Sequence, residues 1–284
     1  MDLNLNNVTF IIVTYNSEEV INNCLDSIPR EVPKIVIENS KNIETKKYLE
    51  NKYDNIKVIL SNNDGMGASN NKGISLSKTQ FVFIINPDTT FKKDTLSNIF
   101  EASKLIEDFA IIAPTNIDLN YPNYQPSGKE IDNNIIEAKS VDGFSMLINK
   151  KKFNSNNFFD ENFFLFLEND DLCKRTINLG NKIYVIKNSF IEHKGFSSVS
   201  KINKEKLELL RNWHWMWSKF YFNKKNYGFV KALILIFPTL TSSFFKIIIN
   251  FIFFNKKKRK IYQARLSGIL NSIFGKNSWY RIDS

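Results

Sequence analysis

A carboxylate directly follows one of the most apolar stretches of the chain. Residues 81–85 read Phe-Val-Phe-Ile-Ile, and the turn Asn86-Pro87-Asp88 comes next. Such a run is typical of a strand buried on both faces of a parallel sheet, which places Asp88 just beyond the strand's carboxyl end. Ligands bind at that edge in open α/β sheets, and a carboxylate there suits a divalent cation that neutralises a diphosphate. The alternative is a turn aspartate that caps the next helix.

More carboxylates surround an aromatic run within residues 159–175. Five acidic residues flank this run: Asp160, Glu161, Glu168, Asp170 and Asp171. An aromatic wall desolvates a neighbouring carboxylate and makes it more basic, as a general base requires. On a helix, Glu168 and Asp171 would share one face. The alternative is a helix start whose acids stabilise the dipole, with Asp171 paired to Arg175.

Two further features are candidates for binding a phosphate or a metal. The turn at residues 62–73 is rich in Gly and Asn and precedes a predicted helix. Small residues let a ligand approach the backbone, and a helix N-terminus favours phosphate. The spacing of these glycines matches neither the dinucleotide fingerprint nor the P-loop. His193 follows a predicted strand; imidazole is a common metal ligand, although a lone histidine is more often structural.

Alternating strands and helices must position these residues. Strands are predicted at 8–14, 34–38, 57–61, 80–85, 109–114, 143–148 and 182–187, and helices after Ser17 as N-cap, up to about Tyr53, and near 67–77, 93–107 and 168–180. Repeated strand–helix–strand units predict an α/β fold whose mostly parallel sheet has helices on both faces. The polar segment 116–138 is predicted to be a long loop or lid that could hold an acceptor.

Composition narrows the possible classes of protein. The chain has 284 residues, of which 43 % are hydrophobic and 14 % aromatic, enough for one large α/β domain and an appendage. The net charge is +10, and the run Lys256–Lys260 would suit nucleic acid or an anionic membrane. Cys24 and Cys173 have no nearby cysteine partner, which argues against a disulfide framework or zinc site and favours a reducing compartment. The polar start predicts no secretory signal peptide.

The order of these motifs resembles that of family 2 glycosyltransferases with the GT-A fold, a Rossmann-like architecture. Within that family the chain is similar to the bacterial rhamnosyltransferase-like branch. The matching segments are Val13–Asn16, Ile37–Ser40, Asn63–Gly73, Asn86–Asp88, and Phe159–Glu161 with Glu168–Arg175 and His193. The resemblance extends from about residue 8 to about residue 228.

This resemblance implies roles for the matching residues. The nucleotide base and ribose would meet Thr14, Tyr15, Asn16 and Glu38, and the nucleotide-sugar would be lined by Asn63, Gly65, Gly67 and Asn70. The family more often has Asp where Glu38 stands. Asp88 and His193 would hold Mg²⁺ or Mn²⁺ at the diphosphate. The general base comes from an acidic pair in this family, but its second position here is Asn169, which cannot accept a proton. The base is therefore Glu168, Asp170 or Asp171.

We therefore expect a GT-A catalytic domain at 1–200 and a C-terminal helical appendage at 201–284. The implied reaction is inverting transfer of a sugar, with rhamnose the first expectation, from a dTDP- or UDP-linked donor to a glycan or lipid-linked acceptor in surface polysaccharide synthesis. Residues 229–254 are apolar but interrupted by Lys231, Pro238 and Lys246. They predict helices lying in the cytoplasmic face of the membrane, peripherally and without crossing it; the alternative is a buried helical hairpin.

Two rival functions remain open at this stage. A nucleotidyltransferase would need a basic phosphate-binding loop after the first strand, and residues 15–18 are not basic. A non-catalytic protein of the membrane surface or of nucleic acid would use the basic tail. It is disfavoured because acidic residues cluster where the crevice of the sheet should lie, and no nucleic-acid partner is predicted.

Overall fold

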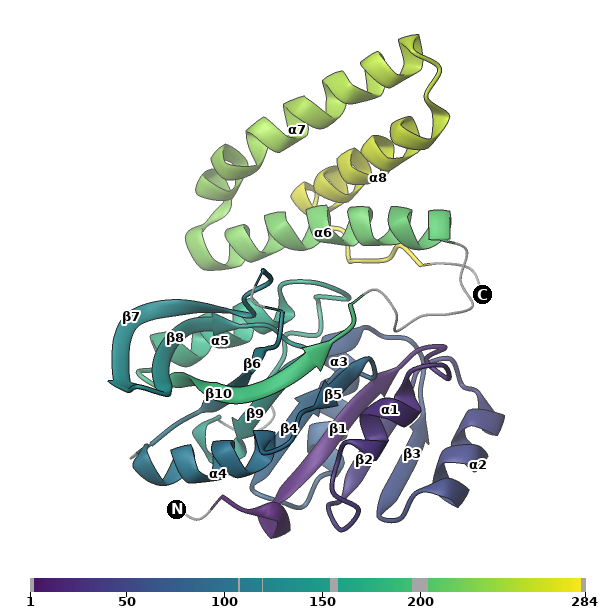
Figure 1. Ribbon diagram of the computed structural model, residues 1–284. Coiled ribbons are helices and arrows are strands. Elements are labelled where there is room, and N and C mark those ends of the chain that lie inside the picture. The colour runs from purple at the N-terminus through teal and green to yellow at the C-terminus, as the bar shows by residue number, and fades with distance from the viewer. Residues whose placement is uncertain (1–2, 107, 119, 154–157, 196–203, 282–284) are drawn as a thin grey trace. The chain divides into compact units, whose positions relative to one another are not determined.

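The structure is a computed structural model that describes residues 3–106, 108–118, 120–153, 158–195 and 204–281. It comprises two compact units (Figure 1). The first contains residues 1–160 and 169–200, and the second contains residues 161–168 and 201–284. A single cut at residue 200, as predicted, misses the short segment 161–168, which belongs with the C-terminal helices.

The first unit is built on one mixed sheet. Its described strands are β1 (Val8–Thr14), β2 (Lys34–Glu38), β3 (Ile56–Leu60), β4 (Phe81–Ile85), β5 (Thr89–Phe91), β6 (Ile111–Asn116), β7 (Tyr124–Asp132), β8 (Ile135–Val141), β9 (Ser145–Asn149) and β10 (Ile183–His193). They follow the order β3-β2-β1-β4-β9-β6-β10-β8-β7, with β5 on β10. Strands β3, β2, β1 and β4 are parallel, and β9 is antiparallel to both its neighbours.

Helices cover both faces of this sheet (Figure 1). They are α1 (Ile21–Asp26), α2 (Ile43–Lys52), α3 (Met66–Leu76), α4 (Thr95–Leu105) and α5 (Glu168–Asn178), with 3-10 turns η1 (Leu5–Asn7) and η2 (Lys150–Lys152). Alternate strand residues enter different cores: Phe10 and Ile12 pack with α1 and α4, whereas Ile11 packs with α3 and α5. A sheet buried on both faces needs continuous apolar strands, which is why β4 is apolar throughout and why Phe10–Val13 of β1 are apolar.

The predicted α/β fold class is confirmed, and two local predictions are wrong. The segment 116–138 is not one long loop, because most of it belongs to an antiparallel hairpin that β7 and β8 form over residues 124–141. Only β8 turns apolar residues inward, while β7 is almost wholly exposed, so the hairpin lacks the apolar signal of a buried strand. Ser17 does not cap α1: the helix begins at Ile21 with Val20 as N-cap.

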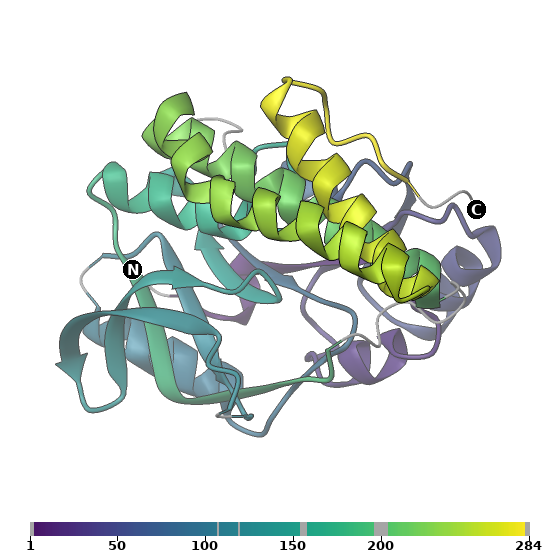
Figure 2. The same ribbon diagram turned by 90° about the horizontal axis from the view of Figure 1, so that it is seen from above.

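The second unit is helical. Helices α6 (Lys204–Tyr227), α7 (Phe229–Ile252) and α8 (Lys256–Ile273) lie side by side, as both ribbon views show (Figures 1 and 2). They share a small apolar core of Met216, Phe220, Ala232, Ile236 and Ile269. Gly268 allows α8 to approach α6 closely, because a Cβ there would lie 2.3 Å from the carbonyl oxygen of Trp213.

Candidate active site

The predicted donor-binding residues Thr14 and Glu38 are the last residues of two neighbouring parallel strands. Thr14 of β1 pairs in register with Glu38 of β2, and both are buried. The Glu38 carboxylate accepts hydrogen bonds from Ser40 N at 3.1 Å, Ser40 Oγ at 2.5 Å and Asn42 N at 2.6 Å. Glu38 therefore orders the loop after β2, a role that the resemblance did not imply, and its contact with a base or ribose stays a prediction.

The turn after β1 and the start of α3 bring the other predicted residues to this edge. Asn16 has φ +50°, and Tyr15 N donates a hydrogen bond to Ser17 Oγ at 3.1 Å, so the chain turns sharply here. Gly65, with φ +109°, is the N-cap of α3, a backbone conformation that favours glycine. Gly67 and Asn70 are buried in α3, and Asn63 is half-buried in the loop before it.

A pocket of about 440 Å³ lies beside this loop. It is lined by Lys41, Ile43, Leu60, Ser61, Asn62, Asp64 and Lys72. The ammonium of Lys72 donates to Ser61 Oγ at 3.0 Å, which holds α3 against the end of β3. Lys72 is not among the predicted site residues, although it lies within the matching segment Asn63–Gly73.

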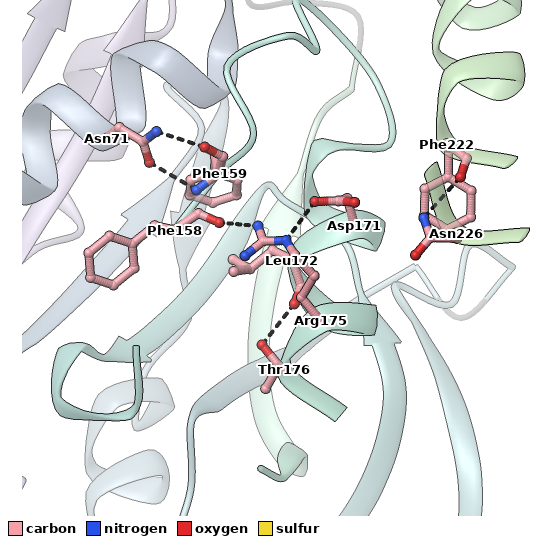
Figure 3. A network of polar contacts seen from close by, with 9 residues as sticks. All are labelled: Asn71, Phe158, Phe159, Asp171, Leu172, Arg175, Thr176, Phe222 and Asn226. Atoms are coloured by element: carbon pink, nitrogen blue, oxygen red, sulfur yellow. Dashed lines mark hydrogen bonds and ion pairs between the residues drawn. The ribbon is translucent and has the colours of Figure 1, made fainter. Parts of the chain in front are cut away.

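Helix α3 also holds the segment that leads toward the acidic cluster (Figure 3). The amide of Asn71 donates to the carbonyl of Phe159 at 2.8 Å and accepts from Phe159 N at 3.0 Å. This paired contact joins residues 88 positions apart. It fixes the Phe159–Glu161 segment, matched on sequence grounds, beside the helix that follows the glycine-rich turn.

The structure brings Asp88 and His193 together from distant parts of the first unit's sequence. His193 Nε2 lies 3.4 Å from Asp88 Oδ1, and Asp88 is 4 % exposed. Strand β5 pairs with β10 so that Thr89 is opposite His193, and Phe144 stacks on the imidazole with centroids 4.2 Å apart. Asp88 is not the cap of the next helix, because the N-cap of α4 is Asp94.

This pair fits a divalent cation as part of its ligand set. Within the described residues, no three His, Cys, Asp or Glu side chains gather as a metal site. A carboxylate and an imidazole are both ligands that Mn²⁺ accepts, and a cation bound to a substrate diphosphate takes further ligands from phosphate oxygens and water. The two side chains therefore suit a cation that arrives with the diphosphate.

Two of the three candidate bases on α5 have different surroundings. Asp171 is completely buried, and Arg175 Nε donates to its Oδ2 at 2.8 Å, while Arg175 also donates to the carbonyl of Phe158 (Figure 3). The ion pair predicted as the alternative for Asp171 is thus confirmed. For Asp170, burial raises the pKa to about 6, and the negative charge of Asp142 contributes to this increase.

Asp142 is a candidate site residue that the sequence analysis missed. Although much of this side chain is exposed, desolvation raises the pKa of its carboxyl, and His193 partly counteracts the effect. The turn that carries Asp142 is held by α5: Asn169 Nδ2 donates to Val141 O at 3.0 Å, and Gly143 packs on the Asn169 side chain. Asn169, the departure from the family's acidic pair, makes a hydrogen bond that an aspartate could not donate.

These residues are linked electrostatically within the first unit. Asp88 adjoins His193, His193 acts electrostatically on Asp142, and Asp142 on Asp170. The pair of Asp88 and His193 is thus linked to a carboxyl group whose pKa is raised to about 6. Such an arrangement supports charge stabilisation at one end and proton abstraction at the other.

Comparison with known proteins gives the family and the fold of the chain. The low-salt glycan biosynthesis hexosyltransferase Agl10 of Haloferax volcanii is 27 % identical over 203 residues, which cover 62 % of this chain and 64 % of that protein, so the chain spans less than two thirds of this relative. Two solved structures share the fold. The mannosyltransferase PcManGT of Pyrobaculum calidifontis, in complex with GDP-Man and Mn²⁺, has a TM-score of 0.57 at 12 % identity over 95 % of this chain and 88 % of its own. S. aureus TarS residues 1–349 with UDP-GlcNAc has a TM-score of 0.53 at 16 % identity over 97 % and 93 %.

The family model for glycosyl transferase family 2 matches residues 9–174, which is more than half of the chain and includes Asp88, Asp142 and Asp170. The finer assignment to a rhamnosyltransferase-like branch is not confirmed by these relatives. Because the family model covers more than half of its residues, the chain belongs to glycosyl transferase family 2.

Proposed function

We propose that the protein is an inverting glycosyltransferase that moves a sugar from a nucleotide-sugar to a hydroxyl of a glycan or lipid-linked acceptor in surface polysaccharide synthesis. The observation that carries this proposal is the linked site of Asp88, His193, Asp142 and Asp170. It combines a place for a diphosphate-bound cation with a carboxyl group whose pKa is raised to about 6, and a raised pKa makes this group a better general base for transfer to a hydroxyl.

Asp170 is the general base in this proposal. Its carboxylate takes the proton of the acceptor hydroxyl while the acceptor oxygen forms a bond to the anomeric carbon. The bond from that carbon to the diphosphate oxygen breaks, and its electron pair leaves with the nucleotide diphosphate. Desolvation makes Asp170 a better base than an exposed aspartate, whereas Asp171 is held by Arg175. Glu168, at the first position of α5, is the second candidate.

Asp88 and His193 would hold Mg²⁺ or Mn²⁺. When bound, such a cation supplies positive charge that stabilises the departing diphosphate. The residues of the chain itself orient the donor. Stacking of Phe144 on His193 and the hydrogen bond from Lys194 N to Asp88 O at 3.1 Å keep this end of the site in place.

The pocket lined by Lys72 supports a nucleoside-binding role for the edge beside β2 and β3. Its lysines can donate hydrogen bonds to the carbonyl oxygens of a pyrimidine base, such as the uracil or thymine of a UDP- or dTDP-linked donor. Agl10 is named a hexosyltransferase and PcManGT a mannosyltransferase, and the two solved structures hold GDP-Man or UDP-GlcNAc. Rhamnose, a deoxyhexose, is therefore one donor sugar to test alongside these hexoses.

Calorimetry with a panel of UDP-, dTDP- and GDP-linked sugars in Mn²⁺ tests the proposal. We expect one nucleotide class to bind and to support transfer or slow donor hydrolysis. Lys72→Met should weaken donor binding about tenfold, as loss of a charge-assisted hydrogen bond does, whereas exposed Lys78→Met should not. Failure of every nucleotide-sugar and nucleoside diphosphate to bind would refute the assignment.

We further propose that the second unit docks on the cytoplasmic face of an anionic membrane. Helix α7 is long and apolar enough to cross a membrane by length and composition, although this alone is weak support. Its outward residues at positions 230, 234, 237, 244, 248 and 252 recur at helical spacing and are exposed. They continue into the α7–α8 turn, where Phe253 and Phe254 are 76 % and 88 % exposed. The buried free thiols Cys24 and Cys173 suit the reducing cytoplasm.

An in-plane position explains these features better than a crossing. The inner face of α7, with Ala232, Ile236 and Ser243, is buried against the neighbouring helices. One of these neighbouring helices, α8, begins with the basic run Lys256–Lys260. If α7 crossed the membrane, its packing with α8 would draw this run toward the hydrocarbon region, where charged side chains are costly. Lying in the interface, α7 buries only its outer face, and the basic run meets anionic headgroups at about 1 kcal/mol per residue.

Vesicle flotation tests this docking. Full-length protein should float with vesicles that contain phosphatidylglycerol, and high salt should release it only in part. Phe253→Ser with Phe254→Ser should reduce flotation, and Lys256→Glu with Lys258→Glu should do so on anionic vesicles only. The control is Leu105→Ser, which changes an exposed apolar residue of α4 in the first unit. Wild-type protein that stays in solution with every vesicle type would rule the proposal out.

A further inference from the structure

The segment immediately before α5 has an unusual backbone. Phe166 and Leu167 are consecutive residues with φ +71° and +66°, in the left-handed region. Residues with side chains rarely adopt this region, and two in succession persist only where the surroundings hold them. Such residues cluster at functional sites, and here they directly precede Glu168, the first residue of α5.

The second unit holds this segment by its backbone. Ser218 of α6 is fully buried, and its hydroxyl donates to the carbonyl of Leu165 at 2.9 Å. Ser278, near the C-terminal end of the described chain, donates to the carbonyl of Asn162 at 2.8 Å. Two serines from distant parts of the sequence thus fix two carbonyl groups of one short segment.

Aromatic contacts hold the side chains of the same segment. Phe163 meets Tyr221 with centroids 4.9 Å apart, Phe164 meets His214 at 4.6 Å, and Phe166 meets Trp215 at 5.3 Å. The Arg281 guanidinium lies 3.6 Å from the centroid of Phe164. Each aromatic residue of the segment therefore packs on a ring of α6, which explains why residues 161–168 group with the C-terminal helices.

We propose that α6 and residues 278–281 form a clamp on residues 162–167 that positions the first turn of α5 for catalysis. This inference rests on the proposed function, in which Asp170 or Glu168 of that turn is the base. If Phe166 and Leu167 relaxed to common backbone angles, the direction of the chain entering α5 would change. A base displaced by about 1 Å loses on the order of 10²-fold in rate, so a strained but fixed turn is useful at this point. Ser218 and Ser278 are positioning residues, since neither reacts.

Ser218→Ala tests the clamp, and Ser243→Ala is its matched control. Ser243 is also buried in the second unit, but its hydroxyl donates at 2.8 Å to Thr239 O of its own helix α7. We expect Ser218→Ala to lower kcat about 10- to 100-fold with the donor KM within about twofold. Hydrogen exchange at the amides of residues 165–168 should become faster. Ser243→Ala should change neither, and donor-binding stoichiometry reports the folded fraction of each variant.

A double-mutant cycle separates positioning from general destabilisation. If Ser218 acts through the base, Ser218→Ala should add little to the loss caused by Asp170→Asn or by Glu168→Gln, whichever of these lowers turnover. Fully additive losses would overturn the proposal, as would unchanged kcat in Ser218→Ala or unchanged exchange at 165–168. If no donor is transferred by the wild type, the proposed function fails, whereas the exchange measurement still decides whether the clamp exists.

Discussion

Burial of ionisable groups has opposite consequences in the two units. In the first unit, desolvation raises the pKa of Asp170 to about 6. In the second unit, desolvation lowers the pKa of His214 to about 4, although its hydrogen bond to the carbonyl of Tyr280 counteracts this. Burial disfavours the charged form in both cases. The acid thereby becomes a better base at neutral pH, while the histidine becomes a neutral packing residue.

The polar partners of these groups explain the difference. Asp170 belongs to a chain of interacting charges that includes Asp142 and His193. His214 instead lies among rings, with Trp213 at 4.9 Å and Phe164 at 4.6 Å between centroids, and its Nε2 is 2.8 Å from the Tyr280 carbonyl. One environment tunes a proton transfer, and the other stabilises a fold. Mutations in the first unit should therefore change the rate, and pH should change the stability of the second.

The largest expected effect follows from removing Asp88. Asp88→Ala should abolish transfer, a loss of about 10³-fold or more, because charge stabilisation of the leaving diphosphate contributes several kcal/mol. Binding of nucleoside diphosphate in Mg²⁺ or Mn²⁺ should weaken too, with an unchanged circular dichroism spectrum. Asp94→Asn, at the exposed N-cap of α4, is the control. Full activity of Asp88→Ala, or of wild type in excess chelator, would contradict a metal at this position.

The next prediction concerns Asp170, where one substitution should lower the turnover rate and raise the stability. Asp170→Asn should lower turnover by about 10²–10⁴-fold, the usual contribution of a general base, with donor binding retained. The folded pKa of about 6 exceeds the ordinary value of 3.8, so the buried charge costs stability above pH 6, and this cost disappears as pH falls through 6 toward 3.8.

At pH 7 the neutral amide should therefore raise the free energy of unfolding by ~1–2 kcal/mol, measured by urea denaturation. Glu168→Gln serves as the comparison. If that variant carries the whole loss of turnover while Asp170→Asn stays within a few-fold of wild type, Glu168 is the base.

Much of the first unit was predictable from sequence because its signal is local. The apolar runs of β1 and β4 identify doubly buried strands, and the turn that follows β4 identifies Asp88. His193 was singled out as an imidazole after a predicted strand, but only the family resemblance joined it to Asp88, and the structure places the two 3.4 Å apart. The hairpin of β7 and β8 was missed because β7 exposes nearly all of its residues.

Other features depend on contacts that no local pattern contains. The pKa of Asp142 is raised by surroundings that the fold assembles from separate segments, so an Asp-Gly turn alone carries no sign of it. Residues 161–168 read as part of the acidic motif, yet their packing partners are α6 and the C-terminal residues. This segment belongs to the second unit because of contacts between residues that are more than 50 positions apart in the sequence.

The second unit should lose stability in mild acid. His214 has a folded pKa of about 4, whereas its ordinary value is 6.5. Its contribution to the free energy of unfolding is therefore complete above pH 6.5 and is lost as the pH falls from 6.5 to about 4. We expect a decrease of about 2–3 kcal/mol in the free energy of unfolding across this window. All four tryptophans, Trp213, Trp215, Trp217 and Trp279, are in this unit, so tryptophan fluorescence follows its unfolding. The same pH dependence in His214→Gln would show that another group is responsible.

The smallest effect tests whether Asp142 and Asp170 are electrostatically linked. In the wild type, kcat/KM should rise with pH through an apparent pKa near 6, because the base must be deprotonated. Asp142→Asn removes a negative charge that favours protonated Asp170, so the midpoint should shift to lower pH, by about 0.5–1 unit for a partly solvated pair. The midpoint should stay above 3.8, since desolvation, the larger cause, remains. Asp64→Asn changes an exposed carboxylate that lines the pocket near Lys72 and should leave the midpoint unchanged. An unchanged midpoint in Asp142→Asn would show that Asp142 and Asp170 are not electrostatically linked. A shift to higher pH would show that a group other than Asp170 sets the acidic limb of the pH–rate profile.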